Sequence, residues 1–260
     1  MRKFTLKWVL ASVIALVLIS SCEKETPSAE PEIIGHRGNP AAYPENTAES
    51  FNSLLSGGIF RLETDVLLTK GDTLILFHDA EVSRLTNLTG LLTDYTPTQI
   101  KAGIKTKSGG TGLTLNEFLD QYEFQFHQIF IDLKEGQGDA VYKLADILIG
   151  TIRKHKLEHK VVITSTSEIV LEYIQNKDNE IQLATDYGSD GMKSAISHHF
   201  PYCLLPIHQM SSSIYSLAQS TGVKVIAYTT TNIIECERAI VYGCDGVITD
   251  VPLEMKVLYE

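Results

Sequence analysis

Short apolar runs alternate with amphipathic stretches along most of this chain, and this alternation is the main structural signal in the sequence. Runs rich in Ile, Val and Leu predict β-strands, because such side chains pack well on a pleated, buried surface. Eight strands are predicted, over residues 32–36, 61–67, 129–133, 161–165, 181–185, 203–207, 223–228 and 246–249.

Stretches with the helical spacing of apolar residues lie between these runs. They cover residues 48–55, 115–122, 140–155, 168–176, 192–199, 214–221 and 233–242. Strands joined by crossovers of helix length predict a parallel sheet. Eight such units within residues 32–260 favour one closed α/β domain, a TIM (β/α)8 barrel. An open doubly wound sheet is the alternative.

One stretch interrupts the alternation. The apolar run Leu74–His78 leads into residues 79–113, which are rich in Thr, Gly, Asp and Pro. A loop of this length in a compact domain is usually functional or mobile. We therefore expect a small insertion after the second strand that lies over the mouth of the barrel. A surface excursion with no part in binding is the alternative.

Two carboxylates stand close together on the second predicted strand. Glu63 and Asp65 are two residues apart, so they project to the same side of the strand. Two carboxylates repel each other there unless a proton or a cation lies between them, and a hard divalent ion suits oxygen ligands. Ion pairs with Lys134 and Arg37 are the alternative explanation.

Histidines follow two of the apolar runs, and further polar residues end a third. His36 and His78 could flank the acids as general acid and general base, because imidazole changes charge near neutral pH. Asp132 and Lys134 end the third strand, and TIM barrels collect their chemistry at the carboxyl ends of the strands. This layout predicts metal-assisted hydrolysis. Asp250, before Pro252, is expected to brace a loop.

The charge of the chain limits the classes of partner. The formal net charge at pH 7 is −10, which does not favour nucleic acid as a ligand. An anionic substrate would need a metal ion and a few well-placed cations, because the overall field repels it. Individual basic residues near the predicted site are therefore candidates for binding an anionic substrate.

The first 22 residues have the order of an export signal. A basic start with Arg2, Lys3 and Lys7 precedes an apolar segment, and small residues stand before Cys22. Cys22 fits a bacterial lipobox, so we expect it to be lipidated, with residues 23–31 as a flexible tether. The expected location is the bacterial cell envelope, anchored through lipid and facing the periplasm or the cell surface. An uncleaved anchor is the alternative.

The remaining cysteines show no metal-binding spacing. Cys203, Cys236 and Cys244 lack a C-x-x-C pattern, which favours buried apolar roles. A disulfide between two of them is the alternative in an oxidising compartment.

Five short motifs occur in a fixed order along the body of the chain. They are IGHRG at 34–38, PENT at 44–47, ETD at 63–65, HD at 78–79 and GCDGVITD at 243–250. In this order and spacing they resemble the glycerophosphodiester phosphodiesterase family, from residue 32 to the C-terminus. The resemblance implies a TIM barrel, one divalent cation that is Ca²⁺ or Mg²⁺, and a small-molecule glycerophosphodiester substrate.

The same resemblance assigns roles to individual residues. His36 and His78 correspond to the acid/base pair, and the metal ligands correspond to Glu63, Asp65 and Asp132. The phosphate-binding residues correspond to Arg37 and Lys134. Glu45 is similar to an active-site glutamate that orients a histidine or touches the ion, and Tyr228 is expected to contact substrate.

Three positions depart from the usual pattern of that family. Asp132 stands where a glutamate is usual, Tyr228 where a tryptophan is usual, and Ser165-Thr166 lacks the usual phenylalanine. The catalytic residues are retained, so the departures concern the alcohol that the pocket prefers.

The expected activity is hydrolysis of a glycerophosphodiester to an alcohol and glycerol 3-phosphate. A related phosphodiesterase or phospholipase acting on a lipid diester is one alternative, which an apolar rim including Leu88, Leu91 and Leu92 would favour. A non-catalytic binding lipoprotein on the same barrel is another. Metal amidohydrolases need H-x-H on the first strand, and His36-Arg37-Gly38 does not provide it.

Overall fold

The computed structural model describes residues 31–134 and 140–259. The predicted export signal, Cys22 and all but the last residue of the predicted tether lie outside the described residues. No helix in the described part of the chain is long and apolar enough to cross a membrane.

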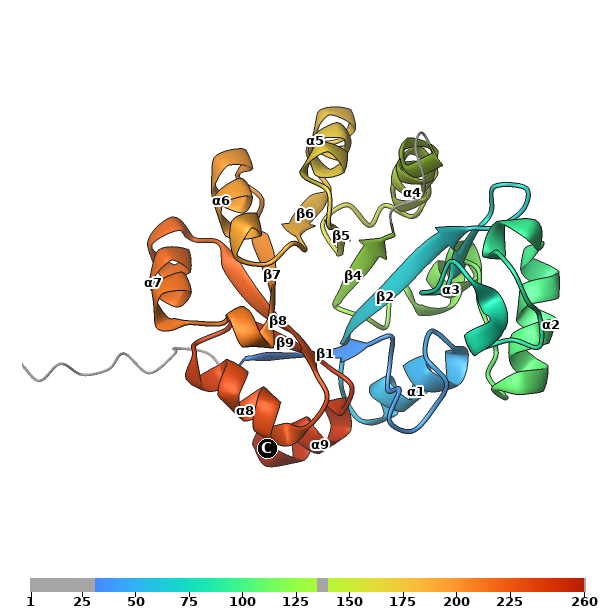
Figure 1. Cartoon of the computed structure of the whole chain (residues 1–260), viewed down its shortest axis with the longest axis horizontal. Helices are drawn as coiled ribbons and strands as arrows, with labels where there is room; N and C mark the ends of the chain where they lie inside the picture. Colours follow the sequence, from blue (N-terminus) through green and yellow to red (C-terminus); the bar gives the residue numbers. More distant parts are fainter. Residues whose placement is uncertain (1–30, 135–139, 260) are drawn as a thin grey trace, which may run out of the picture.

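Eight parallel strands form a closed barrel within the described residues (Figure 1). They are β1 (Glu32–His36), β2 (Arg61–Leu68), β4 (Gln128–Leu133), β5 (Val161–Ser165), β6 (Gln182–Thr185), β7 (Tyr202–Pro206), β8 (Lys224–Thr230) and β9 (Gly246–Thr249). Strand β1 pairs with β9 on one side and with β2 on the other. This pairing closes the sheet, so the predicted TIM barrel is confirmed and the open sheet is wrong.

Helices surround the barrel on its outer side (Figure 1). They are α1 (Ala48–Ser56), α3 (Leu115–Tyr122), α4 (Ala140–His155), α5 (Glu168–Lys177), α6 (Ser189–His198), α7 (Ser212–Thr221), α8 (Ile233–Val241) and α9 (Pro252–Tyr259). The sequence predicted all of these except α9. Helix α9 buries Pro252 and Met255 but exposes Val257 and Leu258, so no clear apolar stripe marks it.

Apolar side chains fill the inside of the barrel below its carboxyl rim. They come from alternating positions of the strands and are Ile34, Phe130, Val162, Ala184, Tyr202, Leu204, Ile226 and Ile248. Successive residues of a strand face opposite sides, so the next inward position lies two residues further on. The rim positions above this plug are therefore the ones that can carry chemistry.

The insertion after β2 is a folded unit and not a loop. Strand β3 (Leu74–Leu76) pairs antiparallel with β2, and two short 3₁₀ turns, η1 (Val82–Arg84) and η2 (Leu92–Asp94), precede helix α2 (Pro97–Lys107). Helix α2 was not predicted, because Thr96 and Pro97 at its start look like turn residues, although Thr96 and Gln99 form a capping box.

The insertion has its own small core and lies at the edge of the barrel. Ile75, Phe77, Val82, Leu92, Ile100 and Ile104 are buried together. None of residues 79–113 lines the central pocket, and α2 lies at the periphery (Figure 1). The expected position over the mouth is therefore wrong, because these apolar residues hold the insertion against β2.

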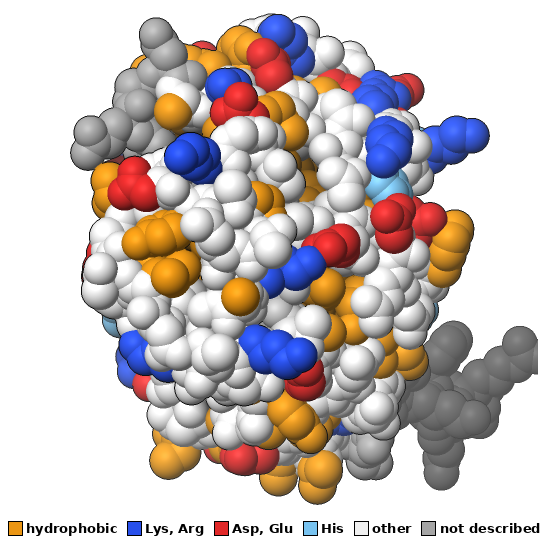
Figure 2. Space-filling model, turned by 90° about the vertical axis from the view of Figure 1, so that its right-hand side faces the viewer, with side chains coloured by type: hydrophobic (Ala, Val, Ile, Leu, Met, Phe, Trp, Pro, Cys, Tyr) orange, Lys and Arg blue, Asp and Glu red, His pale blue; other side chains and the backbone are white. Residues whose placement is uncertain are grey.

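The same packing bears on the lipid-diester alternative. Leu92 is buried and Leu88 packs against the insertion's core, which leaves Leu91 as the exposed member of the three leucines. Figure 2 shows the face of the molecule on the side where α2 lies. On this face, apolar side chains occur in separate groups among polar and charged ones. The apolar rim that this alternative needs is not present on that face.

The three cysteines of the body are buried free thiols. Cys203, Cys236 and Cys244 pack in the main core between barrel and helices. The disulfide alternative is therefore wrong for these residues.

Candidate active site

A pocket opens at the carboxyl ends of the barrel strands, and most of the predicted site residues line it. The predicted residues in its wall are His36, Arg37, Glu63, Asp65, His78, Asp132, Lys134 and Tyr228. Strand alternation explains the convergence, because His36, Asp132 and Tyr228 each stand two residues after a member of the apolar plug. The sequence therefore identified one spatial cluster. The remaining predicted site residues are Glu45, described below, and Cys22, which lies outside the described residues.

Three carboxylates meet at one point of this pocket. In the strand register Asp65 of β2 is the partner of Asp132 of β4, and Glu63 is the partner of His36 of β1. Glu63, Asp65 and Asp132 each offer an oxygen, and these oxygens lie within 4.8 Å of one another. All three side chains are buried. Burial and the neighbouring Asp65 raise the pKa of Glu63 well above its ordinary value. Such crowded, hard oxygen donors could hold a divalent cation.

Two basic side chains contact these acids. Arg37 Nε lies 3.1 Å from Asp65 Oδ2, and Lys134 Nζ lies 3.2 Å from Asp65 Oδ1 and also bonds Asp132. Burial acts to lower the pKa of Lys134, but Asp132 and Asp65 outweigh burial and raise it. Burial likewise opposes ionisation of Asp65, yet Arg37 and Lys134 hold its pKa below the ordinary value. The ion-pair alternative thus describes Asp65, whereas burial raises the pKa values of both Glu63 and Asp132.

Both predicted catalytic histidines are held through Nδ1 by a carboxylate. His36 Nδ1 lies 2.6 Å from Asp250 Oδ1, and His78 Nδ1 lies 2.6 Å from Asp79 Oδ1. A carboxylate accepts the Nδ1 proton, which leaves Nε2 as the nitrogen free to exchange a proton in the pocket. The Nε2 atom of His36 lies 3.9 Å from Glu63 Oε2.

Asp250 therefore orients His36, a contact that the expected loop-bracing role did not include. It follows Ile248 of the apolar plug by two residues, so the same alternation that identified Asp132 could have found it. Asp79 belongs to the HD motif at 78–79, but its contact with the His78 ring was not predicted.

Glu45 binds two arginines and not a histidine. Its carboxylate accepts hydrogen bonds from Arg37 Nη1 at 2.9 Å and from Arg84 at 2.6 and 2.7 Å. Arg84 also bonds Asp79, the partner of His78. The network joins the phosphate-binding candidate Arg37 to His78 through the insertion. Arg84, the last residue of the 3₁₀ turn η1, was missed because it is a surface residue with no motif around it.

The loop after β1 places Arg37 through a left-handed turn. Arg37 and Gly38 have φ angles of 53° and 98°, and a Cβ on Gly38 would lie 2.2 Å from Ser50 Oγ. Asn46 fixes the opposite side of this turn, because its backbone N–H donates to Arg37 O and its Nδ2 donates to Asp65 Oδ2 at 2.9 Å. Asn46 is thus a supporting residue whose role was not predicted.

Asp186 is a further acid in the pocket wall that the sequence did not identify. It comes directly after β6 and two residues after Ala184 of the apolar plug, so the spacing rule applies to it as well. Burial and the nearby charge of Asp132 raise its pKa to about 7.

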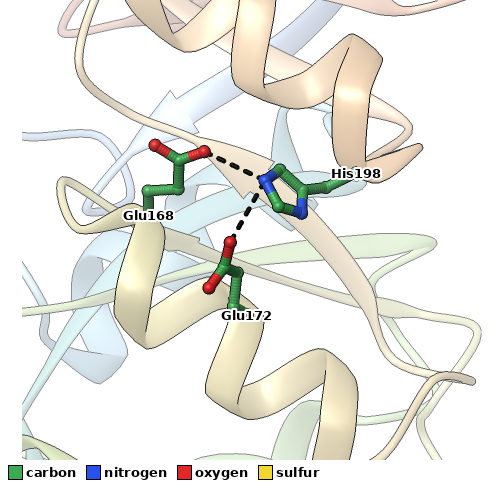
Figure 3. Close-up of side chains that lie close together, drawn as sticks. All are labelled: Glu168, Glu172 and His198. Carbon is green, nitrogen blue, oxygen red and sulfur yellow. Dashed lines mark hydrogen bonds and ion pairs between the residues drawn. The ribbon is translucent and has the colours of Figure 1, made fainter.

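A second group of potential metal ligands lies on the outer surface. Glu168 and Glu172 of α5 both reach Nε2 of His198 of α6, at 2.9 and 3.2 Å (Figure 3). The two carboxylates and the imidazole satisfy one another in a partly exposed ion pair between helices. Such pairs contribute little to stability, and we assign no site to this group.

Comparison with known proteins identifies the family. The model of the glycerophosphoryl diester phosphodiesterase family matches residues 36–254. A glycerophosphodiester phosphodiesterase of Caldanaerobacter subterraneus is 27% identical over 234 residues, which cover 85% of this chain and 94% of that protein.

Solved structures of similar proteins share the fold. A phosphodiesterase of Oleispira antarctica in complex with the product sn-glycerol-3-phosphate matches with a TM-score of 0.80 at 20% identity, covering 88% of this chain and 96% of that one. A glycerophosphodiester phosphodiesterase of Thermotoga maritima matches with a TM-score of 0.73 at 24% identity, covering 89% and 99%. At these identities the likeness concerns the barrel.

Proposed function

The chain belongs to the glycerophosphoryl diester phosphodiesterase family, and we propose that it hydrolyses glycerophosphodiesters to an alcohol and glycerol 3-phosphate with the help of one divalent cation. One observation carries the proposal. Three carboxylates converge in a pocket that also contains two histidines, each held by a carboxylate, and two basic side chains.

The donor set fits a hard divalent ion. Glu63, Asp65 and Asp132 supply only carboxylate oxygens, which suit Ca²⁺ or Mg²⁺ better than a soft metal. The buried Asp65 Oδ1 accepts no hydrogen bond from the described residues, although Lys134 lies near it. When bound there, such an ion supplies Lewis-acid stabilisation of charge on the phosphate oxygens.

Arg37 and Lys134 supply the positive charge that an anionic substrate needs in an acidic protein. Charge on the nonbridging oxygens grows as the bond to phosphorus breaks, so fixed cations near them stabilise the transition state more than the ground state. Glu45 and Asp65 bond Arg37 and fix its orientation before substrate arrives.

The two histidines move the protons. One Nε2 removes a proton from the attacking oxygen, and the other protonates the oxygen of the departing alcohol. The attacking oxygen is either water or the 2-hydroxyl of the glycerol moiety, and the second route passes through a cyclic phosphate. Asp250 and Asp79 fix the rings through Nδ1, so both act as positioning residues.

The proposal is tested by incubating the purified full-length protein with glycerophosphoethanolamine and measuring released glycerol 3-phosphate. We expect turnover with added Mg²⁺ or Ca²⁺ and its loss on addition of EDTA, with recovery when the ion is restored. Turnover that persists unchanged in EDTA would contradict metal dependence. Absence of turnover with both ions would contradict the activity.

Substitution of Asp250 by asparagine is expected to lower kcat by about 10- to 100-fold with little change in KM, because the imidazole of His36 loses its orienting partner. Kinetics with glycerophosphoethanolamine across pH measure the effect, and the pH profile should change together with kcat. The matched control is Glu254→Gln, an exposed acid of α9. Equal kcat and pH profiles for the two variants would show that Asp250 has no role in orienting His36.

We also propose that Cys22 carries a lipid that anchors the enzyme to a bacterial envelope membrane, facing the periplasm or the cell surface. The support is the order of basic start, apolar segment and small residues before Cys22.

A further inference from the structure

Asp186 is an acid for which the proposed mechanism has no use. In the closed strand order β6 lies four strands away from β1, so Asp186 stands across the barrel from His36. Its oxygens are not among those that converge with Glu63, Asp65 and Asp132. It therefore belongs to the pocket without belonging to the cation site.

The described residues give Asp186 no basic partner within ion-pair distance. Its Oδ1 atom is buried and accepts no hydrogen bond from any described side chain or backbone group. Tyr228, which lines the pocket together with Asp186, brings a neutral hydroxyl and no positive charge. Buried acids in proteins are normally paired with a cation, because an unpaired buried charge is costly.

The charges of the pocket make this acid more unusual. Apart from the two histidines, four carboxylates and two basic side chains line it. A bound divalent cation would bring their formal sum to zero, and the phosphodiester then adds one negative charge. An acid at this place repels a substrate that carries only the phosphate charge.

A cation carried by the substrate would remove this imbalance. The Tyr228 ring lines the same wall as Asp186, and aromatic faces attract ammonium groups. Leu204 adds apolar surface that suits the methylene or methyl groups around such a nitrogen. An acid, an aromatic ring and an apolar side chain together fit an amino alcohol.

We propose that Asp186 and Tyr228 form a subsite for a cationic leaving alcohol, a primary or quaternary ammonium alcohol esterified to the phosphate. This inference rests on the proposed phosphodiesterase function and names the class of diester that the pocket selects. The carboxylate pairs with the ammonium group, and Arg37 and Lys134 in the same pocket would bind the phosphate.

The test compares four diesters with the full-length protein and added Mg²⁺ or Ca²⁺. Glycerophosphoethanolamine and glycerophosphocholine carry a cationic alcohol, and glycerophosphoglycerol and glycerophosphoinositol carry a neutral one. The wild type should show a higher kcat/KM for the cationic pair. Asp186→Asn should lower kcat/KM for that pair by about 10- to 100-fold, mainly through KM, and change the neutral pair by less than about threefold. Tyr228→Leu should reduce the same preference.

The neutral diesters serve as the internal control for folding, and Asp190→Asn, an exposed acid on α6, serves as the matched variant. Equal losses on both classes of diester would overturn the subsite, since Asp186 would then act on the shared glycerophosphate part. A wild type that hydrolyses all four diesters equally would also overturn it while leaving the proposed function intact. A wild type inactive on all four would overturn both.

Discussion

Replacing His36 with alanine is expected to lower kcat for glycerophosphodiester hydrolysis by about 10²- to 10⁴-fold, with a much smaller effect on KM. The physical reason is that Asp250 fixes Nδ1, so Nε2 is the nitrogen available for proton transfer. Alanine removes that nitrogen and leaves the acids and Arg37 in place to bind the diester. The same loss is expected for His78→Ala.

The matched control is His198→Ala, which removes a histidine that also contacts carboxylates but lies on the surface between α5 and α6 (Figure 3). Its kcat should equal that of the wild type. If His36→Ala and His198→Ala were equally active, His36 would have no part in catalysis.

A more acidic leaving alcohol separates the roles of the two histidines. A glycerophosphodiester of p-nitrophenol needs little protonation of its leaving oxygen, so the variant that lacks the general acid should recover most of its activity on it. The variant that lacks the general base should stay slow on both substrates. This comparison assigns the acid and the base.

Replacing Glu63 with glutamine is expected to lower kcat/KM by about 10³-fold, because one of the three carboxylates that would hold the cation is lost. Stability should respond differently. Burial and Asp65 raise the pKa of Glu63, so the folded, metal-free protein stabilises the neutral form of this side chain relative to the charged form. Glutamine resembles that neutral form, and the metal-free variant should unfold at the same temperature as the metal-free wild type or at a higher one.

Thermal unfolding with and without added cation measures this difference. The wild type should gain stability with Mg²⁺ or Ca²⁺, because a ligand that binds the folded state stabilises it, and Glu63→Gln should gain much less. A cluster that served only as buried ion pairs would give another result. The cation would then leave the unfolding temperature of the wild type unchanged, and glutamine would retain most of the activity.

Much of the fold followed from local patterns. The strand runs ended close to where β1, β5 and β9 end, and the helices, α2 and α9 excepted, were predicted. The insertion was the main error, since its helix α2 buries only Ile100, Gly103 and Ile104 and its start lies among turn-forming residues. A short helix held by a small separate core leaves a weak pattern in the sequence.

The sequence by itself determined which positions face the pocket, because side chains alternate along a strand and the polar residues on β1, β2 and β4 follow that spacing. Only the tertiary structure decided which side chains contact each other in and around the pocket. Asp250 meets His36 across 214 residues because barrel closure sets β9 beside β1, and Arg84 meets Glu45 because the insertion packs against β2. The tertiary structure likewise showed that the described residues give Asp186 Oδ1 no hydrogen-bond partner. Such contacts depend on how distant strands close and pack, and no local spacing encodes them.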